Sequence, residues 1–334
     1  MTHDVHDAPT FNRRALLGVA AGFAVAVGAV SARRSFAADA PAGGVKSDAP
    51  PFVAHKVQRG AGVLQARDYP GEGPALVMLH GFPDNLHIYD EMLPMLVAAK
   101  RRVVTFDFMG FGDSEKPKGY VYNFDQQLAD LDAVVQALDL KTIVPVAHDA
   151  GGPAAINYAL SNPRRIASMV LLNTFYADAP TLKFPELIEL CADPGLHDLA
   201  RAIIGDPEKA QWLLNFQNAH FEAKAPADLR KRFDTLLQPV INENFKKGSG
   251  PAFLAMTADA RRAVAANDKR VGELATFKPH VNVVWGIQDP YLDAGVAKDF
   301  AGHFPNATYN PIEAGHWPQI DRPEVVAKAI LAGL

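Results

Sequence analysis

The sequence is poor in residues that crosslink a chain or bind metals. Its 334 residues include a single cysteine, Cys191, so no disulfide can close within the chain. Cysteine and histidine do not occur with the spacing of a zinc site, and there is no HExxH motif. We therefore expect no metal site, and we interpret Cys191 as a small buried residue.

Clustered positive charge is also missing. Lys and Arg total 33 against 37 for Asp and Glu, which gives a formal net charge of −4. No run of Lys and Arg alternates with aromatic residues, so the sequence gives no reason to expect a nucleic-acid partner. Hydrophobic residues make up 49% and charged residues 21%, an ordinary globular composition. Without internal repeats, this length suits one large α/β domain with an insertion.

The one long apolar run lies near the amino terminus. Arg13 and Arg14 precede residues 15–32, which are rich in Ala, Gly and Val. Small residues around positions 35–38 could supply a cleavage site. This pattern predicts a twin-arginine export signal over residues 1–37, hence a periplasmic protein without stable membrane insertion after cleavage. The alternative is an uncleaved anchor, although the run is short for a bilayer. Residues 38–51 are predicted to be a flexible lead-in.

Apolar runs alternate with helical patterns through most of the remaining sequence. Strands are predicted at 52–58, 62–69, 74–79, 103–108, 142–147, 166–173, 281–285 and 307–310. Helices are predicted at 86–99, 124–138, 153–160 and 324–331. The alternation predicts an α/β fold with a mostly parallel, eight-stranded sheet and helices on both faces.

Residues 176–278 interrupt this alternation. Helical patterns dominate there, and no strand pattern is clear. We predict a helical cap, inserted between a first core part at 52–175 and a second core part at 279–334. The cap should cover the carboxyl edge of the sheet, where open α/β sheets carry their chemistry.

Asp149 stands between a predicted strand and the helix that follows. The preceding run at 142–147 is apolar and β-branched, and the aspartate is surrounded by Ala147, Ala150 and Gly151. A tight turn of small residues lifts the central side chain above the sheet edge, as in a nucleophile elbow. Serine there would attack acyl groups. Aspartate would instead form an ester on the enzyme, which suits epoxides or carbon–halogen bonds.

Two later residues could complete the chemistry. Asp289 follows the strand at 281–285, and His316 lies in the loop after the last strand. The order nucleophile, acid, histidine is that of an α/β-hydrolase. His316 would act as general base on water, and Asp289 would orient its imidazole. The backbone N–H groups of Phe82 and Ala150 would form the oxyanion hole.

Each of these residues also has an ordinary structural interpretation. Asp149 could cap the helix after it, and Asp289 before Pro290 could form a turn. His316 could be a solvated loop residue. Their joint occurrence at the ends of successive elements favours the catalytic interpretation.

Four short segments carry a family resemblance. They are His80-Gly81-Phe82-Pro83, residues 110–117, residues 148–152 and Gly315-His316-Trp317. Together they resemble the α/β-hydrolase superfamily, in the branch of epoxide hydrolases and haloalkane or haloacid dehalogenases. The resemblance covers residues 74–175 and 281–323 and is weakest in the cap. It implies an Asp–His–Asp triad, a covalent alkyl-enzyme ester and no cofactor.

Within this branch, the residues that identify dehalogenases are absent. Haloalkane dehalogenases usually follow the nucleophile with Trp and the His-Gly turn with Asn, where this chain has Ala150 and Phe82. Fluoroacetate dehalogenases resemble residues 82–87 but carry arginines near the nucleophile, where this chain has Ala150 and Pro153. Both departures count against dehalogenation.

The resemblance to epoxide hydrolases implies an acid in the cap, usually a pair of tyrosines. Tyr176, at the first hinge, is the only tyrosine between residues 175 and 278. Some exported epoxide hydrolases replace one tyrosine by a cap histidine, which makes His197 and His220 further candidates. Either histidine could instead be a surface helix residue.

The sequence thus predicts an exported hydrolase that converts a small hydrophobic epoxide to a diol through an ester on Asp149. Water and the twin-arginine export machinery are the other expected partners. A haloalkane or haloacid dehalogenase with an atypical halide pocket is the second hypothesis. The third is a catalytically silent protein whose cap encloses a small apolar ligand.

Overall fold

The computed structural model describes residues 49–223 and 225–334. The predicted export signal at 1–37 and most of the predicted lead-in lie outside the described residues. Within them, no helix is both long and apolar enough to cross a membrane. Residues 49–223 and 225–334 belong to one compact unit.

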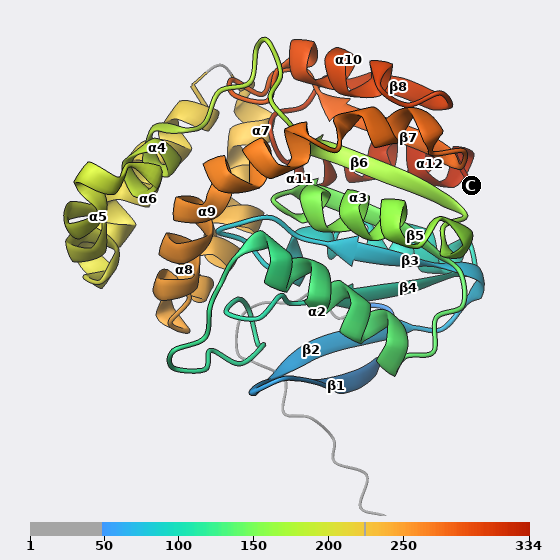
Figure 1. The fold of residues 1–334 in the computed structure, drawn as a ribbon, viewed down its shortest axis with the longest axis horizontal. Helices are drawn as coiled ribbons and strands as arrows, with labels where there is room; N and C mark the ends of the chain where they lie inside the picture. Colours follow the sequence, from blue (N-terminus) through green and yellow to red (C-terminus); the bar gives the residue numbers. More distant parts are fainter. Residues whose placement is uncertain (1–48, 224) are drawn as a thin grey trace, which may run out of the picture. The chain divides into compact units, whose positions relative to one another are not determined.

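The described residues form an eight-stranded sheet in the order β1-β2-β4-β3-β5-β6-β7-β8 (Figure 1). The strands are β1 (Val53–Arg59), β2 (Gly62–Tyr69), β3 (Glu72–Leu79), β4 (Arg101–Phe106), β5 (Ile143–Asp149), β6 (Ser168–Thr174), β7 (His280–Gly286) and β8 (Ala307–Ile312). The pairs β1–β2 and β2–β4 are antiparallel, and the other pairs are parallel. The prediction of a mostly parallel, eight-stranded sheet is confirmed.

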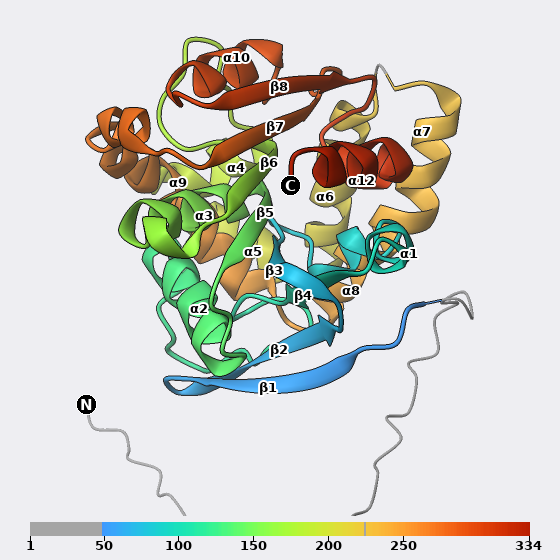
Figure 2. The ribbon, with the colours of Figure 1, turned by 90° about the vertical axis from the view of Figure 1, so that its right-hand side faces the viewer.

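Helices cover both faces of the sheet, which explains why its central strands are apolar throughout. Every side chain of β6 is buried, whereas most of edge strand β1 is exposed. Figure 2 shows α1 (Leu93–Ala98) and α12 (Pro323–Ala332) on one face, and α2 (Phe124–Ala137) and α3 (Gly151–Ser161) on the other. The remaining core helices are η1 (Leu86–Tyr89), η2 (Pro163–Arg165), α10 (Ala294–Gly302) and α11 (Pro318–Asp321).

The helix predicted over residues 86–99 is wrong as one element. A short 3-10 helix, η1, ends at Tyr89, and α1 begins only at Leu93. Pro94 lies in the first turn of α1. Proline has no N–H to donate, so it suits the start of a helix and disrupts its interior.

The described residues of 176–278 contain helices joined by short irregular segments, with no strand at 176–223 or 225–278. Their elements are α4 (Glu186–Ala192), η3 (Pro194–Leu196), α5 (His197–Ile204), α6 (Pro207–Phe221), α7 (Ala227–Arg232), η4 (Phe233–Leu237), α8 (Gln238–Lys246), α9 (Gly250–Asp268) and η5 (Val271–Thr276). Figure 1 shows α4 to α9 gathered beyond the carboxyl ends of β3 and β5. This helical cap therefore lies over the sheet edge at which Asp149 ends β5.

Candidate active site

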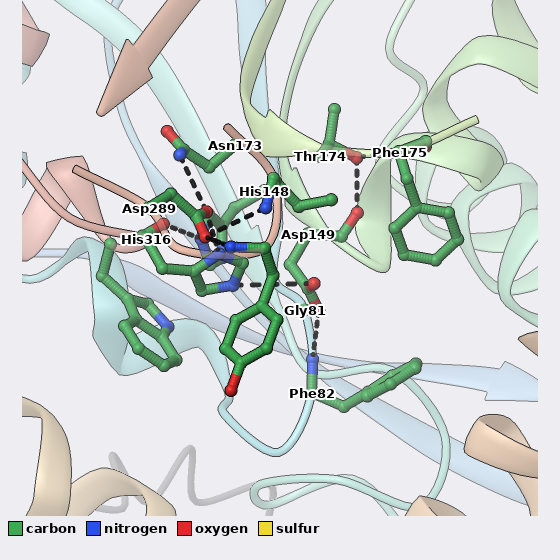
Figure 3. Close-up of polar contacts among 12 residues, drawn as sticks. Gly81, Phe82, His148, Asp149, Asn173, Thr174, Phe175, Asp289 and His316 are labelled. Atoms are coloured by element: carbon green, nitrogen blue, oxygen red, sulfur yellow. Dashed lines mark hydrogen bonds and ion pairs between the residues drawn. The ribbon is translucent and has the colours of Figure 1, made fainter. Parts of the chain in front are cut away.

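Asp149 occupies a strained turn between β5 and α3. Its φ of 47° lies in the left-handed region that residues other than glycine seldom adopt. Small neighbours make room for the turn. A Cβ at Gly151 would lie 2.8 Å from the carbonyl oxygen of His80, and one at Gly152 would lie 1.9 Å from Thr174 Oγ1. The turn fixes the Asp149 side chain at the sheet edge (Figure 3).

The structure brings Asp149, His316 and Asp289 together. His316 Nε2 lies 3.6 Å from Asp149 Oδ2, and His316 Nδ1 lies 2.6 Å from Asp289 Oδ2 (Figure 3). Donation of the Nδ1 proton to Asp289 leaves Nε2 as the basic nitrogen facing Asp149. The arrangement has the geometry of a nucleophile, a base and an orienting acid.

Asn173 is a site residue that the sequence analysis did not identify. Its Nδ2 donates to Asp289 Oδ2 at 3.0 Å and to the carbonyl of Gly286 at 3.0 Å, and its Oδ1 accepts from Gly286 N at 2.7 Å. The backbone N–H groups of Tyr291 and Leu292 donate to Asp289 Oδ1. Asn173 thus ties the loop of the acid to β6. The signal available in the sequence was an asparagine at the end of an otherwise apolar strand.

The carboxylate of Asp149 is close to the two backbone donors predicted for the oxyanion hole. Phe82 N donates to Asp149 Oδ1 at 3.2 Å, and the N–H of Ala150 also bonds to the carboxylate. Gly81 allows this approach, because a Cβ there would lie 2.4 Å from Asp149 Oδ1. Oδ1 therefore lies in the donor pocket, and Oδ2 faces His316.

Burial and charge shift the pKa values of the two reacting groups. Burial raises the pKa of Asp149 to about 6, although His316 and the N–H groups of Ala150 and Phe82 act in the opposite direction. Burial alone would lower the pKa of His316, but Asp289 and Asp149 outweigh it, so this pKa is raised. The site therefore favours the protonated imidazole of His316 and disfavours the negative charge on Asp149.

His148, beside the nucleophile in sequence, has a structural contact. Its Nε2 donates to the carbonyl oxygen of His316 at 2.8 Å. Burial lowers the pKa of His148 to about 4, so the ring is neutral at physiological pH. His148 thus supports the backbone of the His316 loop.

Asp84 and Asn244 of the cap connect the His-Gly-Phe-Pro loop to other loops of the site. Asp84 Oδ2 accepts from Trp317 Nε1 at 2.7 Å, which connects the His-Gly-Phe-Pro loop to the loop of His316. Asn244 Nδ2 donates to the carbonyls of Pro83 and Asp84, each at 2.6 Å, and Asn244 Oδ1 accepts from Gly112 N at 2.7 Å. Neither connection was evident from the sequence.

A cavity with about 680 Å³ of empty space, part of it open to solvent, lies between the cap and the sheet edge. Its wall is mostly apolar, as in small-molecule sites. The residues that line it are Phe82, Pro83, Asp149, Phe175, Lys183, Phe184, Pro185, Leu187, Ile188, Leu214, Gln217, Asn218, Phe221, Phe253, Ala260, Tyr291, Leu292, His316 and Trp317. Asp149 and His316 thus line a cavity that is rich in aromatic side chains.

The three cap donors predicted from the sequence are not brought to this site. Among the described residues that line the cavity, Tyr176, His197 and His220 do not occur. The Tyr176 hydroxyl donates to Asn157 Oδ1 at 2.9 Å, and His220 is exposed and donates to the carbonyl of Phe216. His197 begins α5 and is half-buried away from the cavity wall. The packing of the cap helices decides these orientations.

Tyr291 is a protic group in the cavity wall that the sequence analysis missed. Its hydroxyl donates to Glu186 Oε2 at 2.5 Å and accepts from Gln217 Nε2 at 2.7 Å. Burial raises the pKa of Tyr291 above its ordinary value. Tyr291 lies two residues after Asp289, outside the cap in which the sequence analysis sought a donor.

Metal ligands do not converge in the part of the chain that the structure describes. Within residues 49–223 and 225–334, no group of three or more His, Cys, Asp or Glu side chains could hold an ion.

Comparison with known proteins gives consistent matches. The model of the alpha/beta hydrolase fold family matches residues 74–323. "AB hydrolase superfamily protein YfhM" of Bacillus subtilis (strain 168) is 26% identical over 283 residues, covering 78% of this chain and 90% of that protein. "Haloalkane dehalogenase 2" of Mycobacterium tuberculosis (strain ATCC 25618 / H37Rv) is 25% identical over 267 residues, covering 78% and 88%. A solved structure of the epoxide hydrolase CorEH is similar in fold, with a TM-score of 0.68, 19% identity and coverage of 84% and 98%.

Proposed function

Because this chain belongs to the α/β-hydrolase fold family, we propose that it is a hydrolase with Asp149 as nucleophile and a hydrophobic epoxide as preferred substrate. The observation that carries the proposal is the position of Asp149. One carboxylate oxygen accepts from Phe82 N, the other faces His316 Nε2 at 3.6 Å, and both adjoin an apolar cavity. A carboxylate nucleophile with a water-activating histidine suits ester formation followed by ester hydrolysis.

In the first step, Asp149 Oδ2 attacks an epoxide carbon. A carbon–oxygen bond to the enzyme forms, the ring carbon–oxygen bond breaks, and the freed alkoxide takes a proton. Tyr291 is the acid we assign to this proton transfer, since it lines the cavity and carries a hydroxyl group. Its O–H must turn from Glu186 to the substrate, while Gln217 Nε2 continues to donate to its oxygen. A phenol protonates an alkoxide readily, because the alkoxide is the stronger base.

In the second step, water attacks the ester carbonyl carbon of Asp149. His316 Nε2 takes a proton from the water, and the imidazolium is stabilised by Asp289 at 2.6 Å. The N–H groups of Phe82 and Ala150 hold the oxyanion that develops on Oδ1. The tetrahedral intermediate then expels the diol oxygen, which takes the proton from His316. The second proton of the water, left on the carboxyl of Asp149, passes to the Tyr291 phenolate, which restores both the carboxylate and the phenol.

Dehalogenation is the second candidate, because the relatives similar to this chain include a haloalkane dehalogenase. The same ester would form, and a halide would leave without a proton. The positions that usually hold the halide in such enzymes carry Ala150 and Phe82 here. We therefore rank epoxide opening first.

The test uses His316→Gln, which should form the ester but fail to hydrolyse it. Incubation with styrene oxide should add the mass of the epoxide to the peptide that contains Asp149. The matched control is His303→Gln, a partly exposed histidine paired with Asp299, which should turn over normally. In the wild-type chain, a single turnover in ¹⁸O-labelled water should place the label in Asp149.

The substrate panel separates the remaining hypotheses. Diol formation from styrene oxide supports epoxide hydrolysis. Halide release from haloalkanes or haloacids, without diol formation, would favour the dehalogenase. No adduct with either panel would overturn the proposal and indicate a protein that only binds a small apolar ligand.

A further inference from the structure

One buried amide in the cavity wall has hydrogen-bonding capacity that the protein leaves unused. Asn218 of α6 lines the cavity and is only 6% exposed. Its Nδ2 donates to Gln238 Oε1 at 2.7 Å. Within residues 49–223 and 225–334, nothing donates to Asn218 Oδ1, and this oxygen remains accessible. The cavity wall therefore includes an amide whose oxygen receives no hydrogen bond from the described residues and whose Nδ2 uses one of its two N–H groups.

The hydrogen bond from Asn218 to Gln238 belongs to a chain of amides that fixes the orientation of the Asn218 side chain. Gln238, which accepts from Asn218, donates through its own Nε2 to Asn242 Oδ1 at 2.7 Å. The three amides form a chain from α6 to α8. Because each donor is matched to an acceptor, the chain holds one edge of the Asn218 amide and leaves the opposite edge free.

The other polar groups in the buried wall are already engaged. Gln217 Nε2 donates to Tyr291 and Glu186, and its Oε1 accepts from Leu187 N. Trp317 Nε1 donates to Asp84. Asn218 thus differs from its neighbours in keeping both an acceptor and a donor available to a ligand.

The position of Asn218 relates it to the reacting groups. Phe221 lies three residues further along α6, on the same helix face, and its ring packs 4.9 Å from the ring of His316. Asn218 is therefore one helical turn from the residue that covers the base. A substrate whose reactive carbon meets Asp149 would reach Asn218 with a group several bonds away.

We propose that Asn218 binds a hydroxyl group of the substrate, remote from the reacting carbon. This inference rests on the proposed function and narrows its substrate class to hydrophobic epoxides that carry an alcohol. A hydroxyl fits both free positions, since its O–H donates to Oδ1 and its oxygen accepts from the free N–H of Nδ2. An apolar group at this place would leave the buried amide without a hydrogen-bond partner. Sites that hydrogen-bond a substrate group strongly reject analogues that lack this group.

The experiment compares three epoxides that differ only at the far end of an alkyl chain. One ends in a hydroxyl, one in a methyl ether and one in a methyl group. For the wild-type chain, kcat/KM for diol formation should favour the alcohol by about tenfold or more over both analogues. In Asn218→Leu, kcat/KM for the alcohol should fall to the level of the analogues. Asn215→Leu, an exposed asparagine on the same helix, should keep the wild-type ratio.

Two further measurements cover the cases in which turnover fails. If Asn218→Leu does not fold, Gln238→Leu can be used instead. This variant removes the acceptor that orients the Asn218 amide, so the preference for the alcohol should decrease but not disappear. Calorimetry with the saturated alcohol and its hydrocarbon analogue should show the same tenfold difference in affinity without any reaction. Equal kinetic constants or equal affinities within these pairs would overturn the subsite. Absence of diol and of the Asp149 adduct, with the affinity difference preserved, would overturn the proposed reaction alone.

Discussion

In the mechanism that we propose, Asp149 must be charged to attack, yet it is held where charge is unfavourable. Burial raises its pKa to about 6, and its backbone has a φ of 47°. Both features cost stability and place a poorly solvated carboxylate next to the cavity. The N–H groups of Phe82 and Ala150 partly compensate the charge. The raised pKa of Asp149 therefore leads to a prediction of how the rate of its alkylation depends on pH.

Alkylation of Asp149 should slow as the pH falls through about 6, because the protonated carboxyl is not nucleophilic. The His316→Gln variant should show a higher midpoint, since His316 lowers the pKa of Asp149 in the wild-type chain. The measurement is the rate of adduct formation across a pH series, followed by mass spectrometry. A midpoint that moves downward in the variant would contradict this account of the pair.

A second prediction concerns the loss of the Asn173 amide, which should affect both stability and ester hydrolysis. Asn173→Leu removes the donor to Asp289 and leaves both backbone groups of Gly286 without this partner. Unsatisfied buried groups cost about 1–3 kcal/mol each, so we expect a loss of about 2–4 kcal/mol in the free energy of unfolding. Hydrolysis of the ester should slow more than its formation, because Asp289 acts through His316.

Rapid-mixing kinetics that resolve the two steps, together with urea unfolding, would measure both effects. The matched control is Asn310→Leu, a half-buried asparagine of β8 in the same sheet. Equal slowing of both steps would argue that Asn173 acts only on stability.

At the scale of elements, helix α8 of the cap determines the shape of a core loop. Asn244 is fully buried, and its amide bonds to the carbonyls of Pro83 and Asp84 and to the N–H of Gly112. The loop that it holds carries Phe82, whose N–H points at the nucleophile. A cap helix thus positions a donor that belongs to the core.

Asn244→Ala should release this loop. We expect kcat to fall by about tenfold or more with a smaller change in KM, because the donor acts mainly on developing charge. Steady-state kinetics on an epoxide would test this, with Glu243→Ala, exposed on the same helix, as the control. An increase in KM at unchanged kcat would show that α8 shapes binding alone.

At the scale of the whole molecule, the described chain behaves as one unit. Residues 49–223 and 225–334 belong to a single compact unit, in which Phe221 and Asn244 of the cap contact core loops. We therefore expect cap and core to unfold in one thermal transition. Fluorescence of Trp212 in the cap and of Trp285 in the core, each with the other tryptophans replaced by Phe, would report the two parts separately. Two well-separated midpoints would contradict this prediction.

Export is also a property of the whole chain, and we propose it from residues 1–37 of the sequence. Replacing both Arg13 and Arg14 with Lys should retain the protein in the cytoplasm, because the twin-arginine machinery recognises that pair. Cell fractionation measures the outcome. Unchanged export of the double variant would refute the assignment of the signal.

Patterns in the sequence are enough to predict the sheet, the helical insertion and the positions of Asp149, Asp289 and His316. These features are local: an apolar run predicts a strand, and small residues around Asp149 predict a tight turn. The break at Pro94 escaped prediction because helical periodicity continued across it.

Which cap side chains reach the cavity depends on the packing of the whole fold and could not be predicted from the sequence. Tyr176, His197 and His220 were plausible donors by residue type, but the packing of their helices directs them elsewhere. Asn173, Tyr291 and Asn218 escaped prediction because their partners are distant in sequence; the amide of Asn173, for example, bonds to Asp289, 116 residues away. Local patterns specify elements, whereas the direction in which a side chain points depends on what the whole fold packs against it.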